Sequence, residues 1–206
     1  MKDQIQKLRL VPVVAIHSVE DAEPLADALC EGGLPCAEIT LRTDAGLNAI
    51  KALSGRDNFL LGSGTVHSVD QAKAVVDAGA KFVVTPGFNP RTVTWCLDND
   101  VAIFPGIATP TDLEMALEHG LDVVKFFPAE TLGGVKTLKA FGGPYGDIQF
   151  MPTGGIGPGN LSSYLELSCV LACGGSWMVK SDLLKTGNFQ EIARLTSEAV
   201  ALAQQS

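Results

Sequence analysis

The chain has 206 residues, of which 46% are hydrophobic and 18% charged, a composition typical of a compact folded protein rather than a disordered or fibrous one. Its net charge of −8 argues against a nucleic-acid groove, which needs an excess of Lys and Arg. No apolar stretch approaches the roughly 20 residues of a membrane span, and residues 1–9 are too polar for an export signal. With five cysteines and no C-x-x-C spacing, the sequence predicts a cytoplasmic protein with reduced thiols that binds neither nucleic acid nor membrane.

Short β-rich runs alternate with helical patterns along the chain, after a short lead-in helix within residues 1–9. The expected strands are Val11–Ile16, Cys36–Arg42, Phe59–Thr65, Phe82–Pro86, Ala102–Ile107, Val123–Phe127, Gln149–Thr153 and Val170–Gly174. The helical patterns include Val19–Gly32, Ala45–Leu53, Ser68–Gly79, Thr111–Gly120 and Phe189–Gln204.

Eight strand–helix units about 23 residues apart predict a parallel sheet that closes into a compact (β/α)8 TIM barrel. The chain is short beside the ~250 residues of a typical barrel, which leaves little room for insertions. A doubly wound open sheet is the alternative, but no G-x-G-x-x-G follows the first expected strand. Since no linker or low-complexity segment divides the chain, residues 1–206 are expected to form a single domain.

The second expected strand carries three polar residues at alternating positions. Glu38, Thr40 and Arg42 alternate with apolar residues within Cys36–Arg42. If the apolar set packs on helices, these three side chains face the barrel interior. Burying them is costly unless they pair or bind a ligand. A Glu38–Arg42 pair that merely fills space is the alternative to a functional role.

Lys125 is a lone cation in the apolar run Val123–Phe127, and the same alternation points it inward. Lys is almost never fully buried without a partner. Apolar surroundings and a nearby cation such as Arg42 both favour the neutral amine, which is the nucleophile that attacks a ketone. We therefore predict that Lys125 forms a Schiff base with a keto acid, as in a class I aldolase. A lysine that reaches solvent at the strand end is the alternative.

Glycine-rich turns follow the last two expected strands. Barrels commonly bind phosphate in the loops after their seventh and eighth strands, through free backbone N–H groups. Neither turn is a P-loop, because no Gly-Lys-Ser or Gly-Lys-Thr occurs in the chain. The two turns together predict a phosphate site made of Thr153, Gly154, Gly155, Gly175 and Ser176.

Metal chemistry and acyl transfer find less support. The three histidines, His17, His67 and His119, lack the spacing of metal ligands, and no G-x-S-x-G motif occurs. We expect neither a metal ion nor a cofactor.

A series of motifs in order along essentially the whole chain resembles the 2-keto-3-deoxy-6-phosphogluconate (KDPG) aldolase / 4-hydroxy-2-oxoglutarate aldolase family. The motifs are Glu38–Thr43 (EITLRT), Gly62–Val66 (GSGTV), Thr85–Gly87 (TPG), Pro105–Ile107 (PGI), Lys125–Glu130 (KFFPAE), Pro152–Ile156 (PTGGI) and Gly174–Trp177 (GGSW). The resemblance implies a class I aldolase on a (β/α)8 barrel that forms a homotrimer. Its implied reaction, in the Entner–Doudoroff pathway, is the cleavage of KDPG to pyruvate and glyceraldehyde 3-phosphate.

The same resemblance implies roles for individual residues. Lys125 would form the imine with C2 of the keto acid, and Glu38 would move protons through a water molecule. Arg42 and Thr65 would hold the pyruvate carboxylate, with Pro86 lining the same pocket. The phosphate would bind at the two glycine turns.

Two residues, His67 and Lys180, depart from the usual family pattern and leave the preferred chain length and stereochemistry open. Related substrates are 4-hydroxy-2-oxoglutarate and the galactonate epimer of KDPG. A phosphate-binding isomerase or epimerase would use the two glycine turns without needing a buried lysine. A non-catalytic phosphosugar-binding protein would have no use for Glu38 beside Lys125.

Overall fold

The structure, a computed structural model that describes residues 1–205, alternates parallel strands with helices. The strands are β1 (Leu10–Val14), β2 (Cys36–Thr40), β3 (Leu60–Gly64), β4 (Phe82–Val84), β5 (Ala102–Phe104), β6 (Gly106–Ile107), β7 (Val123–Phe126), β8 (Gln149–Phe150) and β9 (Cys173–Gly175). The α-helices are α1 (Lys2–Leu8), α2 (Ala22–Glu31), α3 (Gly46–Leu53), α4 (Val69–Asp77), α5 (Pro90–Asp98), α6 (Pro110–Glu118), α7 (Gly134–Phe141), α8 (Leu161–Leu165), α9 (Ser181–Lys185) and α10 (Phe189–Gln204). Two short 3-10 helices are η1 (Val19–Asp21) and η2 (Glu130–Leu132).

The strands form two parallel sheets rather than one closed barrel. The larger sheet has the order β5-β4-β3-β2-β1-β9 and the smaller has the order β6-β7-β8. The expected strand Ala102–Ile107 is divided at Pro105, which has no N–H to donate to a ladder. On the other side of the small sheet, the segments around β8 and β9 are joined only by the isolated bridges Phe150–Val170 and Thr153–Gly174. The expectation of a closed eight-stranded (β/α)8 TIM barrel is therefore wrong for residues 1–205.

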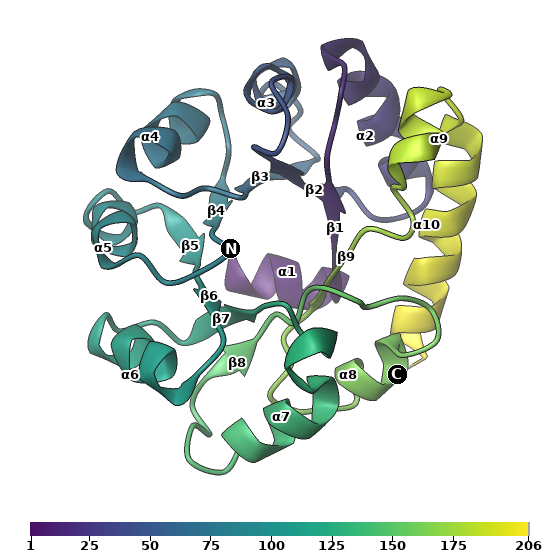
Figure 1. The fold of residues 1–206 in the computed structure, drawn as a ribbon. Helices are drawn as coiled ribbons and strands as arrows, with labels where there is room; N and C mark the ends of the chain where they lie inside the picture. Colours follow the sequence, from purple (N-terminus) through teal and green to yellow (C-terminus); the bar gives the residue numbers. More distant parts are fainter. Residues whose placement is uncertain (206) are drawn as a thin grey trace.

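The two sheets curve around a common centre with the helices outside them (Figure 1). This arrangement produces two apolar cores, one between the strands and the outer helices and one enclosed by the strands. The enclosed core contains side chains from both sheets and from α1, among them Ile5, Val11, Phe82, Phe104 and Met151. Helix α1 lies across the centre of the strand ring in Figure 1, and its Ile5 is fully buried. The lead-in helix thus closes the ring at the amino ends of the strands.

The expected alternation of faces is confirmed on β7. Val124 and Phe126 belong to the outer core, whereas Val123 belongs to the enclosed core. Because neighbouring strand residues point to opposite faces, Lys125 points to the inside of the ring. The helix expected at Phe189–Gln204 is also confirmed with the same bounds, as α10.

Capping bonds fix the starts of two helices, α4 at the expected Ser68 and α6 slightly before the expected Thr111. The Ser68 hydroxyl accepts a hydrogen bond from the Gln71 N–H at 3.2 Å, at the start of α4. At α6, Thr109 and Asp112 form a reciprocal capping box. In the part of the chain that the structure describes, none of the helices combines the length and the hydropathy needed to span a bilayer.

Candidate active site

A lysine and a glutamate from the two different sheets meet inside the strand ring. The Lys125 ammonium lies 3.3 Å from Glu38 Oε1, and the two residues are only 2% and 1% exposed. Lys125 is on β7 of the small sheet and Glu38 is on β2 of the large one. The ammonium also lies 5.1 Å from the centre of the Phe127 ring, which gives it a favourable aromatic face.

These contacts decide between the alternatives left open by the sequence. Lys125 does not reach solvent at its strand end, since it is buried against Glu38. Glu38 pairs with Lys125 and not with Arg42, whose guanidinium instead contacts Thr65. A buried ion pair is poor evidence for stability, because desolvation of both ions offsets much of their attraction. The pair is better explained by chemistry that needs an amine and a carboxylate together.

Gly64 on β3 makes room for the Glu38 carboxylate. Gly64 is the register partner of Thr40, one pleat beyond Glu38, and Gly62 is the register partner of Glu38 itself. A Cβ added at Gly64 would lie 2.0 Å from Glu38 Oε1. The motif Gly62–Val66 therefore contributes space rather than reactive groups to this part of the site.

Arg42 and Thr65 lie together at the carboxyl ends of β2 and β3. The Arg42 Nε donates a hydrogen bond to Thr65 Oγ1 at 3.2 Å. Thr65 has a φ of 58°, a left-handed conformation that turns the chain sharply after β3. Arg42 is exposed, so it lies at the rim rather than beside the buried lysine. The structure thus brings these two predicted residues together, in a position where a carboxylate group at the mouth could reach them.

Pro86 is positioned by the buried hydroxyl of Thr85. This hydroxyl donates to the Gly87 carbonyl at 2.7 Å and accepts from the Gly106 N–H at 3.3 Å. It thereby joins β4 to β6 next to the break at Pro105. Pro86 lines a cavity of about 370 Å³ that also contains His67, and this cavity is separate from the one lined by Arg42. Of the two unusual residues, His67 is thus near the mouth, whereas Lys180 is exposed at the start of α9.

The five residues predicted to bind phosphate line one cavity of about 180 Å³. They are Thr153, Gly154, Gly155, Gly175 and Ser176. Arg42 and Phe127 line the same cavity, which connects the glycine turns with the residues around Lys125.

The turn at Gly154 and Gly155 presents its amide donors, not its carbonyl acceptors. The Gly154 carbonyl accepts from the Glu130 N–H at 3.1 Å, and the Gly155 carbonyl accepts from Asn160 Nδ2 at 3.1 Å. In a trans peptide the N–H points opposite to the carbonyl, so the N–H groups of Gly155 and Ile156 point away from these partners. Within residues 1–205 neither of these N–H groups has a hydrogen-bond acceptor. Such an array of backbone donors suits an anion.

The sequence did not single out Glu130 or Asn160 for this task. Glu130 acts on the turn through its backbone N–H, which leaves no trace in the residue type. Asn160 also accepts from the Gly157 N–H at 2.8 Å, a local turn interaction that many loops share.

The buried thiols and the metal-ligating side chains give no competing centre. Burial raises the pKa of Cys96 to about 11, and burial likewise raises the pKa of Cys36 and Cys173. Thiols that stay protonated at neutral pH are poor nucleophiles. Among residues 1–205, no group of three His, Cys, Asp or Glu side chains is arranged to hold a metal ion.

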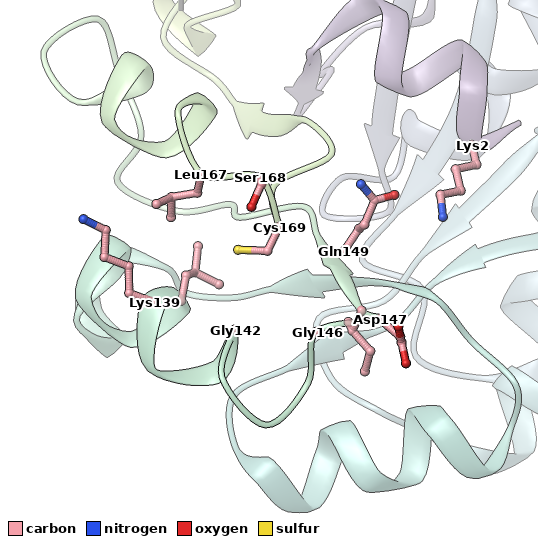
Figure 2. A pocket seen from close by; sticks show the side chains of 11 residues that line it. Lys2, Lys139, Gly142, Gly146, Asp147, Gln149, Leu167, Ser168 and Cys169 are labelled. Atoms are coloured by element: carbon pink, nitrogen blue, oxygen red, sulfur yellow. The ribbon is translucent and has the colours of Figure 1, made fainter.

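A larger cavity, of about 480 Å³, lies at the other end of the strands (Figure 2). Its lining includes Gln149 at the start of β8, together with Lys2, Lys139 and Cys169. Parallel α/β folds place their chemistry at the carboxyl ends of the strands. Size alone therefore does not make this cavity the active site, and none of the predicted site residues line it.

Comparison with known protein families matches residues 1–195 to the family described as KDPG and KHG aldolase. The chain belongs to this family. The resemblance inferred from the sequence motifs is thereby confirmed, and the chain is a member of a family of carbon–carbon lyases.

Two curated relatives in the KDPG/KHG aldolase family cover nearly the whole chain. The 2-dehydro-3-deoxy-phosphogluconate aldolase of Haemophilus influenzae is 46% identical over 199 residues, which are 96% of this chain and 94% of the relative. The KHG/KDPG aldolase of Escherichia coli K12 is 41% identical over 192 residues, which are 93% of this chain and 90% of the relative.

A solved structure shares the same arrangement. The KDPG aldolase from Legionella pneumophila, captured with pyruvate as a covalent carbinolamine intermediate, is 36% identical with a TM-score of 0.93. The match covers 96% of this chain and 97% of that one. The overall fold described above is therefore shared with a solved member of the KDPG/KHG aldolase family.

Proposed function

We propose that this chain is a class I aldolase that cleaves KDPG to pyruvate and glyceraldehyde 3-phosphate through a Schiff base on Lys125. The observation that carries the proposal is the buried contact between the Lys125 ammonium and the Glu38 carboxylate at 3.3 Å. An amine nucleophile and a proton carrier side by side are what imine formation requires.

The reaction can be followed atom by atom. The Lys125 ammonium gives one proton to the Glu38 carboxylate, and its neutral Nζ attacks C2 of the keto acid to form a carbinolamine. Glu38 returns that proton to the carbinolamine oxygen, and water leaves as the protonated imine forms. Glu38 then removes the proton of the C4 hydroxyl, directly or through a water molecule. The C3–C4 bond breaks, its electron pair moves into the imine to form an enamine, and the aldehyde leaves. Protonation of the enamine at C3 by Glu38, followed by hydrolysis, releases pyruvate and restores the lysine.

Binding of the substrate uses groups at the rim. Arg42 and Thr65 are proposed to hold the carboxylate of the keto acid, and Pro86 is proposed to border the substrate from the separate cavity that it lines with His67. The phosphate is proposed to bind at Thr153, Gly154, Gly155, Gly175 and Ser176, which line one cavity together with the unpaired N–H groups of Gly155 and Ile156. Because the chain carries a net charge of −8, these local donors must overcome an unfavourable overall field for an anion.

An unphosphorylated substrate is a second proposal. The E. coli relative carries the name KHG/KDPG aldolase, and a 4-hydroxy-2-oxoglutarate aldolase/KDPG aldolase is 39% identical with a TM-score of 0.90. We therefore propose 4-hydroxy-2-oxoglutarate as an additional substrate. An isomerase function finds less support, because an isomerase has no need for the buried Lys125.

We also propose that the enzyme is a cytoplasmic homotrimer, on the basis of the family resemblance. The five cysteines are all unpaired, in keeping with a reducing compartment. Light scattering coupled to gel filtration measures the assembly directly, and a monomer at micromolar concentration would contradict this part of the proposal.

The Schiff base is tested by chemical trapping. The protein is incubated with pyruvate, reduced with borohydride and digested, and the mass of the peptide containing Lys125 is measured. We expect the added mass on that peptide in the wild type, none in Lys125→Ala, and an unchanged yield in the surface control Lys139→Ala. A folded wild-type protein without any adduct would overturn the proposed mechanism.

A further inference from the structure

The Gly154–Gly155 turn rests on a glutamate whose position is set by a buried tyrosine. Besides the bond from the Glu130 N–H to the Gly154 carbonyl, the Glu130 side chain packs against Gly155. A Cβ added at Gly155 would lie 2.7 Å from both Cβ and Cγ of Glu130. Gly155 has a φ of +79°, so the turn is a conformation that glycine adopts without strain. Glu130 is thus in direct contact with the backbone of the turn.

The carboxylate of Glu130 is held on the side of the turn that faces α7. It accepts a hydrogen bond from the Tyr164 hydroxyl. A Cβ added at Gly134, the first residue of α7, would lie 2.8 Å from Glu130 Oε1 and 2.7 Å from the Tyr164 hydroxyl oxygen. Gly134 therefore keeps space for this pair, as Gly64 does for Glu38.

Tyr164 is well suited to hold the carboxylate. It is fully buried, on α8, whereas Glu130 is exposed. Burial, followed by the hydrogen bond to Glu130, raises the pKa of Tyr164, so the hydroxyl stays a donor throughout the neutral and mildly alkaline range. A buried ring fixes the donor in place, and an exposed carboxylate is free to move when that donor is removed.

A free carboxylate at this point would conflict with the proposed ligand. Two negative groups at one turn repel each other, and the N–H donors of Gly155 and Ile156 would be shared between them. We propose that Tyr164 is a positioning residue for the phosphate-binding turn, and that it acts by keeping the Glu130 carboxylate out of the phosphate site. This inference rests on the proposed function, because it concerns the phosphate group of the substrate.

The chain offers a matched control, since its only other tyrosine also donates to a glutamate. The Tyr145 hydroxyl lies 3.0 Å from Glu114 Oε1, in an exposed pair that lines neither mouth cavity. Tyr145→Phe removes the same atom from the same kind of contact, so it reports the general cost of losing a tyrosine–glutamate hydrogen bond.

The test compares kcat and KM for KDPG with those for 4-hydroxy-2-oxoglutarate in Tyr164→Phe, Glu130→Gln, the double variant and Tyr145→Phe. For Tyr164→Phe we expect KM for KDPG to rise about fivefold, the effect of one hydrogen bond, so that the ratio of kcat/KM for KDPG to that for the unphosphorylated substrate falls by the same factor. Glu130→Gln keeps an acceptor for Tyr164 without a charge, and its ratio should stay at the wild-type value.

The double variant distinguishes repulsion between the Glu130 carboxylate and the phosphate from a loss of packing around Tyr164. If a released carboxylate competes with the phosphate, adding Glu130→Gln to Tyr164→Phe removes the charge and returns the ratio toward the wild-type value. A purely structural role predicts a double variant at least as impaired as Tyr164→Phe. Inhibition by inorganic phosphate should follow the same order, weakest in Tyr164→Phe.

The possible results are distinguishable. If the wild type gives no pyruvate adduct and no cleavage, the proposed function fails. If the wild type is active but Tyr164→Phe and Tyr145→Phe have the same substrate ratio, the positioning role is overturned. An equal loss for both substrates in Tyr164→Phe, or a double variant that shows no recovery, also overturns it.

Discussion

The two sheets differ in continuity, and the reactive pair lies across the boundary between them. In the six-stranded sheet, β2 and β3 are paired over five consecutive residues, whereas β6 and β8 of the small sheet have only two residues each. Glu38 comes from the continuous sheet and Lys125 from the short one. The regular region thus supplies the proposed proton carrier and the rim, and the interrupted region supplies the nucleophile and one phosphate turn. The distance of 3.3 Å between Lys125 Nζ and Glu38 Oε1 therefore depends on the positions of both sheets, the regular one and the interrupted one.

The largest effect is expected from a change to the Glu38 carboxylate, which the continuous six-stranded sheet supplies. In Glu38→Gln the side chain keeps its size and its hydrogen-bonding oxygen but cannot accept a proton. We expect kcat for KDPG cleavage to fall by about 10²–10⁴-fold, the usual contribution of general acid–base catalysis. Steady-state kinetics measures this loss, and proton exchange at the methyl group of pyruvate should fall with it. Exchange at the wild-type rate would contradict the role of Glu38.

A smaller change moves Glu38 without altering any reactive group. Gly64→Ala places a methyl group where only 2.0 Å separates it from the carboxylate oxygen, so the carboxylate must shift. Misplacement of a catalytic group by about 1 Å can cost on the order of 100-fold, and we expect a loss of kcat of up to that size. Gly55→Ala is the control, since nothing lies within 4 Å of its new Cβ. Equal activity of the two variants would show that the position of Glu38 is not set by Gly64.

The smallest effect is expected at the second phosphate turn. Ser176→Ala removes one hydroxyl donor from the cavity shared with Gly154 and Gly155. We expect KM for KDPG to rise about two- to tenfold, the worth of one hydrogen bond, with little change for 4-hydroxy-2-oxoglutarate. Michaelis constants for both substrates measure this selectivity, and an equal rise for the two would argue against phosphate binding at Ser176.

Much of the fold and the site could be predicted because it depends on strand periodicity. The two-residue period correctly placed Lys125 inside the ring and Ala37 and Ile39 on the outer core, and the contact with Glu38 follows from both facing inward. The interruption of the strand ring could not be predicted in this way. It depends on where consecutive N–H groups are available, and Pro105 interrupts them within a run that otherwise reads as a strand.

The contacts that hold the Gly154–Gly155 turn could not be predicted from the sequence either. A backbone N–H from Glu130 and a hydroxyl from Tyr164, 34 residues later, meet there through the packing of η2 and α8. No residue pattern encodes such a contact, whereas Gly-Gly after a strand directly indicates a turn.

Helix α1, which closes the amino end of the strand ring, affects the order in which substrates enter and products leave. Ile5 and the enclosed core fill that end, so we expect a substrate to approach Lys125 from the carboxyl ends of the strands. Lys125 lies deep in the strand ring, and the glycine turns lie near its mouth. If the phosphate binds at the glycine turns as proposed, the substrate enters with its keto end leading. After cleavage the fragment nearer the mouth departs first, so the aldehyde leaves ahead of pyruvate, and in the synthetic direction pyruvate has to bind before the aldehyde.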